Sequence, residues 1–475
     1  MEKARSVLNE VLKEIVPSRK EKKSTENLCR KILKSFEKVA KGFAVEPMFY
    51  GSVAKDTWLA GDKDIDFFLL FSPNVKREYL EKHGMTIGKE IIEDLGGSWE
   101  IAYAEHPYIR GFYKDHRIEI VPAYDVRDPG KIKSAVDRTP YHVRYVKKYL
   151  DPELVNEVRL LKKFLKEIGV YGSDLKTEGF SGYLCELLII KHGTFLNLLE
   201  SAKDWNAGIM FDLEGYYESG EEIRKKFPND PMVVIDPVDR NRNVASVLSA
   251  ENFFTFIKKT KEFLKEPSKE FFFEKEGDTP NPEDIEVEMK NRGTNFIFVK
   301  FRAPTVHQDI LWPQLRKFER RLVSVLKSED FQIMRSDSWS DGIKCVVVLE
   351  IFSKELPKIK RREGPSIFDV DGTKGFLKRY ENYKIFVYNN KWVAEYPRRY
   401  KVATDLLKDF LNKDYERLRE EGVPKEIANE IAKKVDVVDG IGISRFVKMY
   451  GEFRIFLKNY FEKNLIYKNP EDRKL

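Results

Sequence analysis

The hydrophobic pattern of the first 125 residues predicts short strands flanked by helices. The densest apolar run covers residues 67–71 and has no polar side, which is typical of a strand buried on both faces. Strands are expected at 45–49, 64–71, 99–104, 109–113 and 117–121, and helices at 1–14, 22–43 and from Ser72 to about Leu95. This mixture indicates a compact α+β unit.

The remaining pattern is mainly helical and then mixed. Helices are expected at 133–150, 151–169, 183–190, 194–205 and 250–265, with one strand at 231–237. Residues 274–293 are acidic and broken by glycine and prolines, so a linker or exposed loop is expected. Beyond it, strands are expected at 295–301 and 343–352, a helix at 313–327, a basic break at 358–365, a hairpin at 383–396, and helices at 401–419, 424–434 and 443–463.

Length and composition bound the class of protein. A chain of 475 residues is expected to form three or four domains. No run approaches the roughly 18 apolar residues of a membrane span, and the first residues have no signal-peptide core, so a cytoplasmic protein is expected. The three cysteines, Cys29, Cys185 and Cys345, are far apart and are expected to be reduced and mostly buried.

The charge balance permits nucleic-acid binding without requiring it. The chain has 85 basic and 78 acidic residues and a net charge of +7. This is a weaker basic bias than that of a dedicated polybasic protein.

The clearest chemistry lies in a Gly51-Ser52 turn followed by Asp64-Ile65-Asp66. Along a strand, Asp64 and Asp66 lie on one face and Ile65 on the other. Two adjacent carboxylates repel each other unless a cation lies between them, and an oxygen-only pair suits Mg²⁺, while the turn can offer N–H groups and a hydroxyl to phosphates. An isolated Asp-x-Asp is more often a solvated turn, but acids at the mouth of a buried strand are costly unless they are used.

Glu119 is a third acid with a related pattern. Ile118 and Ile120 lie on one face of the expected strand, and Glu119 lies on the other. If this strand neighbours the first, Glu119 lies beside Asp64 and Asp66, and three such acids can hold two Mg²⁺ ions. The alternative is a surface glutamate on an edge strand.

These motifs resemble the signature of DNA-polymerase-β-like nucleotidyltransferases. Longer segments resemble the archaeal class I CCA-adding enzymes (tRNA nucleotidyltransferases); they are AYAEHPY at 102–108, SAVDRTP at 134–140, GFSGYLCEL at 179–187 and DPVDRNRNVA at 236–245. They occur in the expected order in the first half of the chain, and the second half resembles the family only loosely.

The resemblance implies an α+β fold divided into four parts. These are a nucleotidyltransferase catalytic head with a mixed β-sheet at 1–145, a helical central nucleotide-binding domain at 146–270, an α+β body at 271–360 and 420–475, and a tRNA-binding tail at 361–419.

The resemblance also implies site residues. Asp64, Asp66 and Glu119 would be catalytic and would bind metal, and the nucleotide would contact Gly51, Ser52, Lys55, His142, Lys162, Tyr171 and Arg242. The family more often has arginine at Lys55, glutamate at Asp64 and aspartate at Glu119, so each charge is kept while its reach changes. The alternatives are solvated side chains for Lys55 and Lys162, a core position for Tyr171 and a loop ion pair for Arg242.

Contacts with RNA are expected at one histidine and two basic runs. The candidates are His106, Arg361, Arg362, Arg398 and Arg399. Positive charge beside aromatic residues suits phosphate contact and base packing. The alternatives are a histidine that caps a turn at a strand end and ordinary solvated surface.

The function implied is template-independent addition of C, C and A to the 3′ end of tRNA. CTP and ATP would be the substrates, two Mg²⁺ ions the cofactors and pyrophosphate the product, and a homodimer is possible. The alternatives are a poly(A) polymerase-like or oligoadenylate-synthesising enzyme, and a non-catalytic RNA-binding protein, against which the intact acids argue. The absence of a Gly-x-x-x-x-Gly-Lys-Ser/Thr loop argues against a P-loop ATPase.

Overall fold

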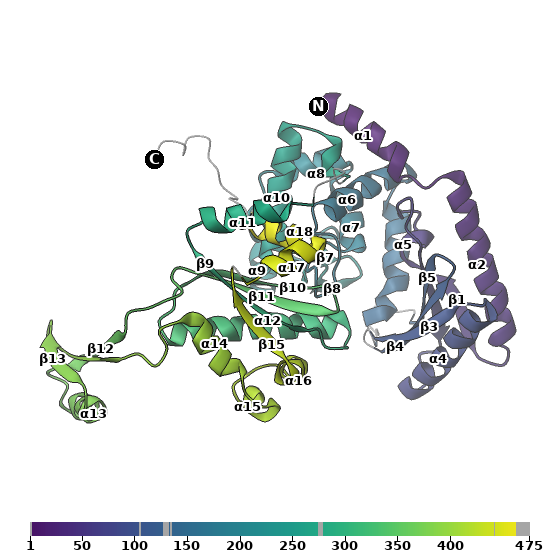
Figure 1. Cartoon of the computed structure of the whole chain (residues 1–475). Helices are drawn as coiled ribbons and strands as arrows, with labels where there is room; N and C mark the ends of the chain where they lie inside the picture. Colours follow the sequence, from purple (N-terminus) through teal and green to yellow (C-terminus); the bar gives the residue numbers. More distant parts are fainter. Residues whose placement is uncertain are drawn as a thin grey trace. The chain divides into compact units, whose positions relative to one another are not determined.

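The described residues of the computed structural model fall into two compact units, one within residues 2–273 and the other within residues 279–461 (Figure 1). It describes residues 2–103, 106–126, 133, 135–273, 279–440 and 442–461. Each unit has hydrophobic cores of its own.

A five-stranded mixed sheet, here called the head sheet, begins the first unit, and its strand order is β1-β2-β5-β4-β3. The strands are β1 (Val45–Phe49), β2 (Asp64–Phe71), β3 (Ser98–Tyr103), β4 (Pro107–Tyr113) and β5 (His116–Tyr124). Strands β2 and β5 are parallel, and the other neighbours are antiparallel. The expected strands and the predicted α+β class with a mixed sheet are therefore confirmed.

Two helices cover one face of the head sheet; they are α2 (Arg19–Val39) and α4 (Arg77–Asp94). Leu28 of α2 and Ile87 of α4 belong to the same core as Ile65 and Phe67 of β2. The other face carries Asp64 and Asp66 at the start of β2, and farther along it is covered by a second, smaller core around Phe68 and Leu70. This face is therefore acidic at one end and apolar at the other.

The rest of the first unit is mostly helical. Its helices are α1 (Glu2–Ile15), α5 (Thr139–Tyr149), α6 (Val155–Glu167), α7 (Gly182–His192), α8 (Phe195–Ala202), α9 (Gly220–Lys226) and α10 (Ala250–Lys265). Phe164 lies at the centre of this core, against the rings of Phe195 and Phe256. Helix α1 buries Leu8 and Val11 here, so it packs with the helical part although it precedes the head sheet in sequence.

A small sheet of order β6-β7-β8 completes the first unit. Its strands are β6 (Ile209–Phe211), β7 (Met232–Asp236) and β8 (Asp239–Asn243), and the short helices of this unit are α3 (Gly51–Ala54), η2 (Ala135–Arg138), η3 (Pro152–Leu154) and η4 (Lys269–Phe271). Every residue of β7 is buried. The turn after β7 therefore begins at a strand that is packed on all sides.

The second unit is built on a four-stranded antiparallel sheet of order β10-β11-β9-β15. Its strands are β9 (Asn295–Arg302), β10 (Ile333–Ser340), β11 (Lys344–Ile351) and β15 (Val435–Asp439). Alternate residues of β9 enter two cores, with Ile297 and Val299 on one face and Phe296 and Phe298 on the other. The helices are α11 (Pro282–Asn291), α12 (Gln308–Ser328), α14 (Ala403–Leu411), α15 (Tyr415–Glu420), α16 (Lys425–Lys433), α17 (Ser444–Met449) and α18 (Gly451–Phe461).

A separate three-stranded sheet, of order β12-β14-β13, follows β11 along the chain (Figure 1). Its elements are β12 (Ile359–Ser366), α13 (Val370–Tyr380), β13 (Lys384–Tyr388) and β14 (Lys391–Pro397). The hairpin turns at Asn389 and Asn390, which both have positive φ as its two-residue turn requires.

Several expectations for the second half are corrected. The basic break is strand β12, because its residues pair with β14. Part of the expected linker is helix α11, which buries Ile285 and Met289, while residues 274–278 and 462–475 lie outside the described residues. Helices α14 and α15 fall within the expected tail, yet they bury Leu407 and Leu418 in the core around β9 and α12.

Two simpler expectations can be checked directly. Cys29, Cys185 and Cys345 are free, and the last two are buried, as predicted. Among the described residues, no helix is both long enough and apolar enough to cross a membrane.

Candidate active site

The acids of the head sheet lie side by side because β2 and β5 are parallel and in register. Asp66 pairs with Glu119, and Asp64 pairs with Arg117. The residue between the acids, Ile65, is buried in the core on the other face. The alternation seen in the sequence therefore places Asp64, Asp66 and Glu119 on one face at the start of two neighbouring strands.

Arginines partly neutralise this acidic face. Arg117 Nη2 donates to Asp64 Oδ2 at 2.9 Å, and Arg110 Nε donates to Glu119 Oε1 at 3.3 Å. Within the described residues, no three histidine, cysteine, aspartate or glutamate side chains converge closely enough to hold a metal ion. The donor set is all oxygen and suits Mg²⁺, and Asp64 and Glu119 would have to turn from their arginines to join Asp66.

Asp66 carries an uncompensated charge. Burial is the largest cause that raises its pKa, the carboxylates of Glu119 and Asp64 add to this, and the charges of Lys55 and Arg117 oppose it. Together they bring the pKa from the usual 3.8 to about 6. A carboxylate in this setting gains from any cation that binds beside it. The electrostatics of the site thus fit a divalent cation, although the present side-chain positions leave the carboxylates apart.

The raised pKa predicts how the metal-free protein responds to pH. Between about pH 4 and pH 6 the folded protein holds a proton on Asp66 that the unfolded chain has released, so stability falls as pH rises through this window. Across this window the free energy of unfolding of the wild type should fall by up to about 2–3 kcal/mol more than that of Asp66→Asn. Urea unfolding in EDTA across this range measures the difference, and parallel curves for the two proteins would contradict it.

Gly51 is required where it stands. Its φ is +64°, and a Cβ at this position would lie 1.7 Å from Asp66 Oδ2. The next residue, Ser52, accepts hydrogen bonds at its carbonyl from the N–H groups of Lys55 and Thr57. The turn is therefore folded tightly against the acidic face, with α3 beginning beside Asp66.

Two lysines expected to contact the nucleotide share one buried carboxylate. Lys55 Nζ lies 2.5 Å from Glu186 Oε2, and Lys162 Nζ lies 3.6 Å from Glu186 Oε1. Thr57 joins them, donating through its hydroxyl to Glu186 and accepting from Lys162. Burial would raise the pKa of Glu186, but the two lysines outweigh it and hold the pKa below its usual range. Neither lysine is the solvated side chain of the alternative interpretation.

Tyr171 lies next to this group. A Cβ on Gly182 would be 3.1 Å from the Tyr171 hydroxyl and 3.7 Å from Lys162 Nζ. The tyrosine ring is half-buried and packs on the helical core. Lys55, Lys162 and Tyr171 therefore belong to one neighbourhood, which joins the Gly51 turn to helices α6 and α7.

A second polar group gathers at the end of β7. His142 Nε2 lies 2.9 Å from Asp236 Oδ2, and Arg242 Nη1 donates to the same oxygen at 2.7 Å. Tyr183 donates to Asp236 Oδ1 and stacks on His142 with ring centres 3.9 Å apart. Burial lowers the pKa of His142, in opposition to its bond with Asp236.

His106 is placed differently from the expectation of an RNA contact. Its side chain is 4% exposed, and its Nε2–H donates to the carbonyl oxygen of Pro122 at 2.9 Å. The ring therefore ties two segments of the head sheet together. This geometry favours the alternative of a structural histidine at a strand end.

The other residues expected to contact RNA lie in the second unit and differ in exposure. Arg361 and Arg362 are exposed on β12, and the Arg361 guanidinium lies 4.7 Å from the centre of the Tyr388 ring. The Arg398 side chain is only 10% exposed and is paired with Asp330 at 2.6 Å, whereas that of Arg399 is 76% exposed. Arg398 is therefore a structural ion pair, and the other three remain accessible.

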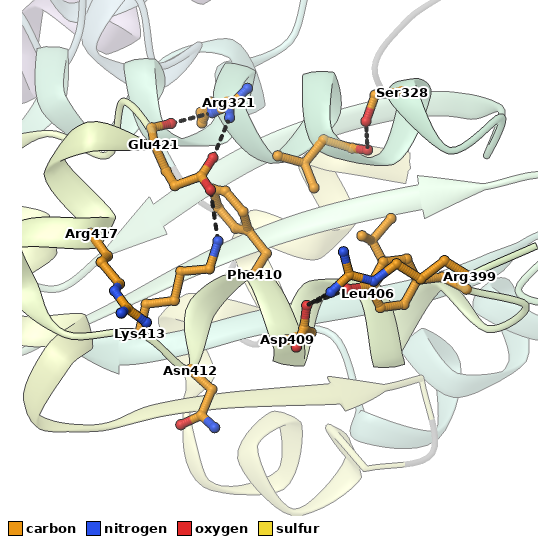
Figure 2. Close-up of a pocket in the computed structure, with 12 residues that line it drawn as sticks. Arg321, Ser328, Arg399, Leu406, Asp409, Phe410, Asn412, Lys413, Arg417 and Glu421 are labelled. Atoms are coloured by element: carbon orange, nitrogen blue, oxygen red, sulfur yellow. Dashed lines mark hydrogen bonds and ion pairs between the residues drawn. The ribbon is translucent and has the colours of Figure 1, made fainter. Parts of the chain in front are cut away.

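Arg399 borders a cavity of about 420 Å³ between α12, α14 and α15. Figure 2 shows Arg321 and Lys413 both directed at Glu421, and Arg399 directed at Asp409. Since basic side chains outnumber acidic ones in its lining, the cavity is suited to an anionic group.

Several residues of these groups were not anticipated from the sequence; they are Thr57, Arg110, Arg117, Tyr183, Glu186 and Asp236. A signal existed for two of them. Glu186 is the only acid in the apolar helix α7, and Asp236 ends a strand that is otherwise apolar. A lone charge in an apolar element is expensive to bury and needs a partner.

Three family models match the chain in succession. They describe a nucleotidyltransferase domain at residues 29–142, the second domain of tRNA nucleotidyltransferase at 156–273, and the C-terminal domain of the CCA-adding enzyme at 292–440.

Curated relatives match nearly the whole length of the chain. A CCA-adding enzyme of Methanocaldococcus jannaschii is 38% identical, over 91% of this chain and 95% of its own. Those of Methanothermobacter thermautotrophicus and Archaeoglobus fulgidus are 37% and 34% identical, over 93% and 92% of this chain and 96% and 95% of theirs. A solved structure of Cid1 aligns at 14% identity with a TM-score of 0.46, covering 58% of this chain and 99% of that chain, which is too distant to bear on the assignment.

Proposed function

The chain belongs to the CCA-adding enzymes, a nucleotidyltransferase family, and from this premise we propose that it adds C, C and A to the 3′ end of tRNA, using CTP and ATP. The observation that carries the proposal is the parallel register of β2 and β5, which sets Glu119 directly beside Asp66. Asp64 follows on the same face of β2, and this grouping of three acids supports the proposal because the relatives are nucleotidyltransferases.

The acids would hold Mg²⁺. Asp64, Asp66 and Glu119 supply only carboxylate oxygens, and the raised pKa of Asp66 supports a positive charge beside it. When bound, two such ions neutralise charge on the triphosphate and lower the pKa of the RNA 3′-hydroxyl. The protein's own task is to hold the three acids on one face of the sheet, which Gly51 supports by leaving room for Asp66.

The nucleotide would lie against the two polar groups of the first unit. The residues that would face the triphosphate are Ser52, Lys55, His142, Lys162 and Tyr171. Arg242 would meet the base edge, because its guanidinium is anchored at one nitrogen while the side chain remains 36% exposed. Positioning and charge stabilisation are sufficient for phosphoryl transfer, so no covalent intermediate is required.

The parts of the chain would divide these tasks. The head sheet would act as the catalytic head and the helical part as the central nucleotide-binding domain. The sheet around β9 would form the body, and the small sheet β12-β14-β13 would form the tRNA-binding tail. The enzyme would be located in the cytoplasm. A homodimer is possible, and light scattering would measure the oligomeric state.

Incorporation of labelled CTP and ATP tests the proposal. The acceptor is a tRNA that lacks its 3′ CCA, assayed with Mg²⁺ for wild type and for Asp64→Ala/Asp66→Ala. Ordered addition of C, C and A by wild type alone supports the reaction and its site. Long adenosine tails would indicate a poly(A) polymerase-like enzyme, and tRNA binding without incorporation would indicate a non-catalytic binder.

The tail prediction concerns the exposed arginines of β12. Charge reversal in Arg361→Glu/Arg362→Glu should weaken tRNA binding about tenfold or more. The slope of log affinity against log salt concentration should become shallower, by the amount expected for the loss of about one to two phosphate contacts. Filter binding across a salt series measures both. The matched control is Lys34→Glu/Lys41→Glu, which makes the same charge change at exposed lysines in and just after α2. An equal effect of the two double variants would show only a loss of net charge.

A further inference from the structure

One buried carboxylate is bonded to side chains from three elements around the proposed nucleotide site. Asp236, at the end of β7, is fully buried and accepts hydrogen bonds at both oxygens. Oδ2 lies 2.9 Å from His142 Nε2 and 2.7 Å from Arg242 Nη1, and Oδ1 accepts from Tyr183 Oη at 3.3 Å and from the Val238 N–H at 3.1 Å.

These partners come from three different elements. His142 lies on α5, Tyr183 on α7 and Arg242 on β8. His142 is held at its edge by Asp236 and on its face by Tyr183, whose ring is inclined to it by 21°. The histidine can therefore turn only if the carboxylate or the tyrosine moves.

The charges favour a tight link. Burial works to raise the pKa of Asp236, but the bond from His142 and the charge of Arg242 outweigh it, and the pKa lies below its usual range. The carboxylate is thus ionised and bound to the Arg242 guanidinium. Charge-assisted hydrogen bonds of this kind are short and strong.

A second aspartate stabilises the small sheet without touching these side chains. Asn243 donates to Asp230 Oδ2 at 2.8 Å and to the Met232 carbonyl, and it accepts from the N–H groups of Val234 and Ala245. The β7–β8 pairing therefore has its own polar anchor. Asp236 contributes one bond to the β7–β8 turn, from the Val238 N–H, and its other bonds are directed at the side chains of His142, Tyr183 and Arg242.

We propose that Asp236 is a positioning residue that sets nucleotide selectivity by holding His142 and Arg242 at one fixed separation. This inference rests on the proposed function, in which His142 faces the triphosphate and Arg242 the base edge. A nucleotide presents these two parts at a distance set by its ribose. Because His142 and Arg242 are linked through Asp236, a nucleotide fits only when its base reaches Arg242 while its triphosphate contacts His142. A nucleotide with the wrong base loses both contacts together.

The first test is Asp236→Asn, which keeps the size of the side chain and removes its charge. With a tRNA lacking CCA and with one ending in C-C, the KM for CTP and for ATP should rise about tenfold or more, with a much smaller change in kcat. Misincorporation of UTP and GTP should increase by a similar factor. Asp230→Asn is the matched control and should leave KM, kcat and misincorporation close to wild type.

The second test measures coupling without turnover. Binding of ATP is titrated for His142→Ala, Arg242→Ala and the double variant, first with Asp236 present and then with Asp236→Asn. The two losses should be non-additive with Asp236 and additive without it, because the carboxylate is the shared partner. Asp236→Glu keeps the charge at a different length, so it should bind ATP better than Asp236→Asn while still misincorporating.

The outcomes separate this inference from the proposed function. If wild type adds C, C and A while Asp236→Asn behaves as Asp230→Asn does, the positioning role is wrong and the proposed function stands. Additive losses of ATP affinity in His142→Ala and Arg242→Ala, with Asp236 present, would likewise overturn the positioning role. If wild type adds no nucleotide, the proposed function itself fails. Should Asp236→Asn not fold, as judged by circular dichroism, accurate incorporation by a folded Asp236→Glu would overturn the inference.

Discussion

Asp66→Asn is expected to abolish nucleotide addition while leaving tRNA affinity nearly unchanged. Asp66 lies between Asp64 along β2 and Glu119 across the sheet, so it is the one acid adjacent to both others. Loss of its charge should reduce kcat by about a thousandfold or more, because several kcal/mol of charge stabilisation disappear. Single-turnover incorporation of labelled CTP measures the chemistry, and filter binding measures tRNA affinity.

The matched control for this variant is Asp94→Asn. Asp94 ends α4, which covers the face of the head sheet opposite the acids, and it forms an ion pair with Lys38. This variant should add C, C and A at close to the wild-type rate. A kcat of Asp66→Asn within tenfold of the wild-type value would show that the acidic face is not the catalytic site. Loss of tRNA affinity along with activity would point to misfolding instead.

The second large effect is expected on stability, from Glu186→Gln. The Glu186 side chain is fully buried, and those of Lys55 and Lys162 are 8% and 3% exposed, so the substitution leaves two lysine charges without their counter-charge. Removing one partner from a buried ion pair costs about 3–5 kcal/mol. Hydrogen exchange should show the loss in α6 and α7 of the first unit, with the second unit unaffected.

Its control is Glu167→Gln, on the same helix as Lys162. Glu167 pairs with Lys163 one turn away at 3.3 Å, and an isolated helical pair of this kind is worth about 0.3–0.5 kcal/mol. A loss in Glu186→Gln no larger than in this control would contradict the buried network.

A compensating change separates stability from nucleotide binding. Lys162→Met added to Glu186→Gln removes one of the two unpaired charges, so part of the lost stability should return. Affinity for ATP should not return, because Lys162 is proposed to face the triphosphate. Recovery of both properties together would show that Lys162 serves the core alone.

Local pattern was sufficient to predict the acidic face of the head sheet. The alternation of Asp64, Ile65 and Asp66 assigns the two acids to one face of β2 whatever the strand's neighbours are. The apolar residues after them require a central strand, and β5 carries Glu119 with the same alternation. The α+β class followed from the same reasoning, since strand and helix periods alternate clearly in the first 125 residues.

Irregular or basic segments were harder to assign. Residues 359–366 contain lysine, arginines, glycine and proline, so they have little strand signal, yet they pair with β14 because that strand supplies the backbone partners. Helix α11 carries acids that obscure its two buried residues, Ile285 and Met289. In each case a neighbour distant in sequence, rather than local propensity, set the outcome.

Sequence pattern alone was enough to assign the acidic face of β2 and β5, most of the longer helices and the family motifs, because these depend on residues close together in the chain. Three features could be seen only in the folded chain: Glu186 pairs with both Lys55 and Lys162, Asp236 links His142 to Arg242, and His106 is buried. Those contacts join elements far apart in sequence. Their strength depends on burial, which removes competing water and appears only once the chain has folded.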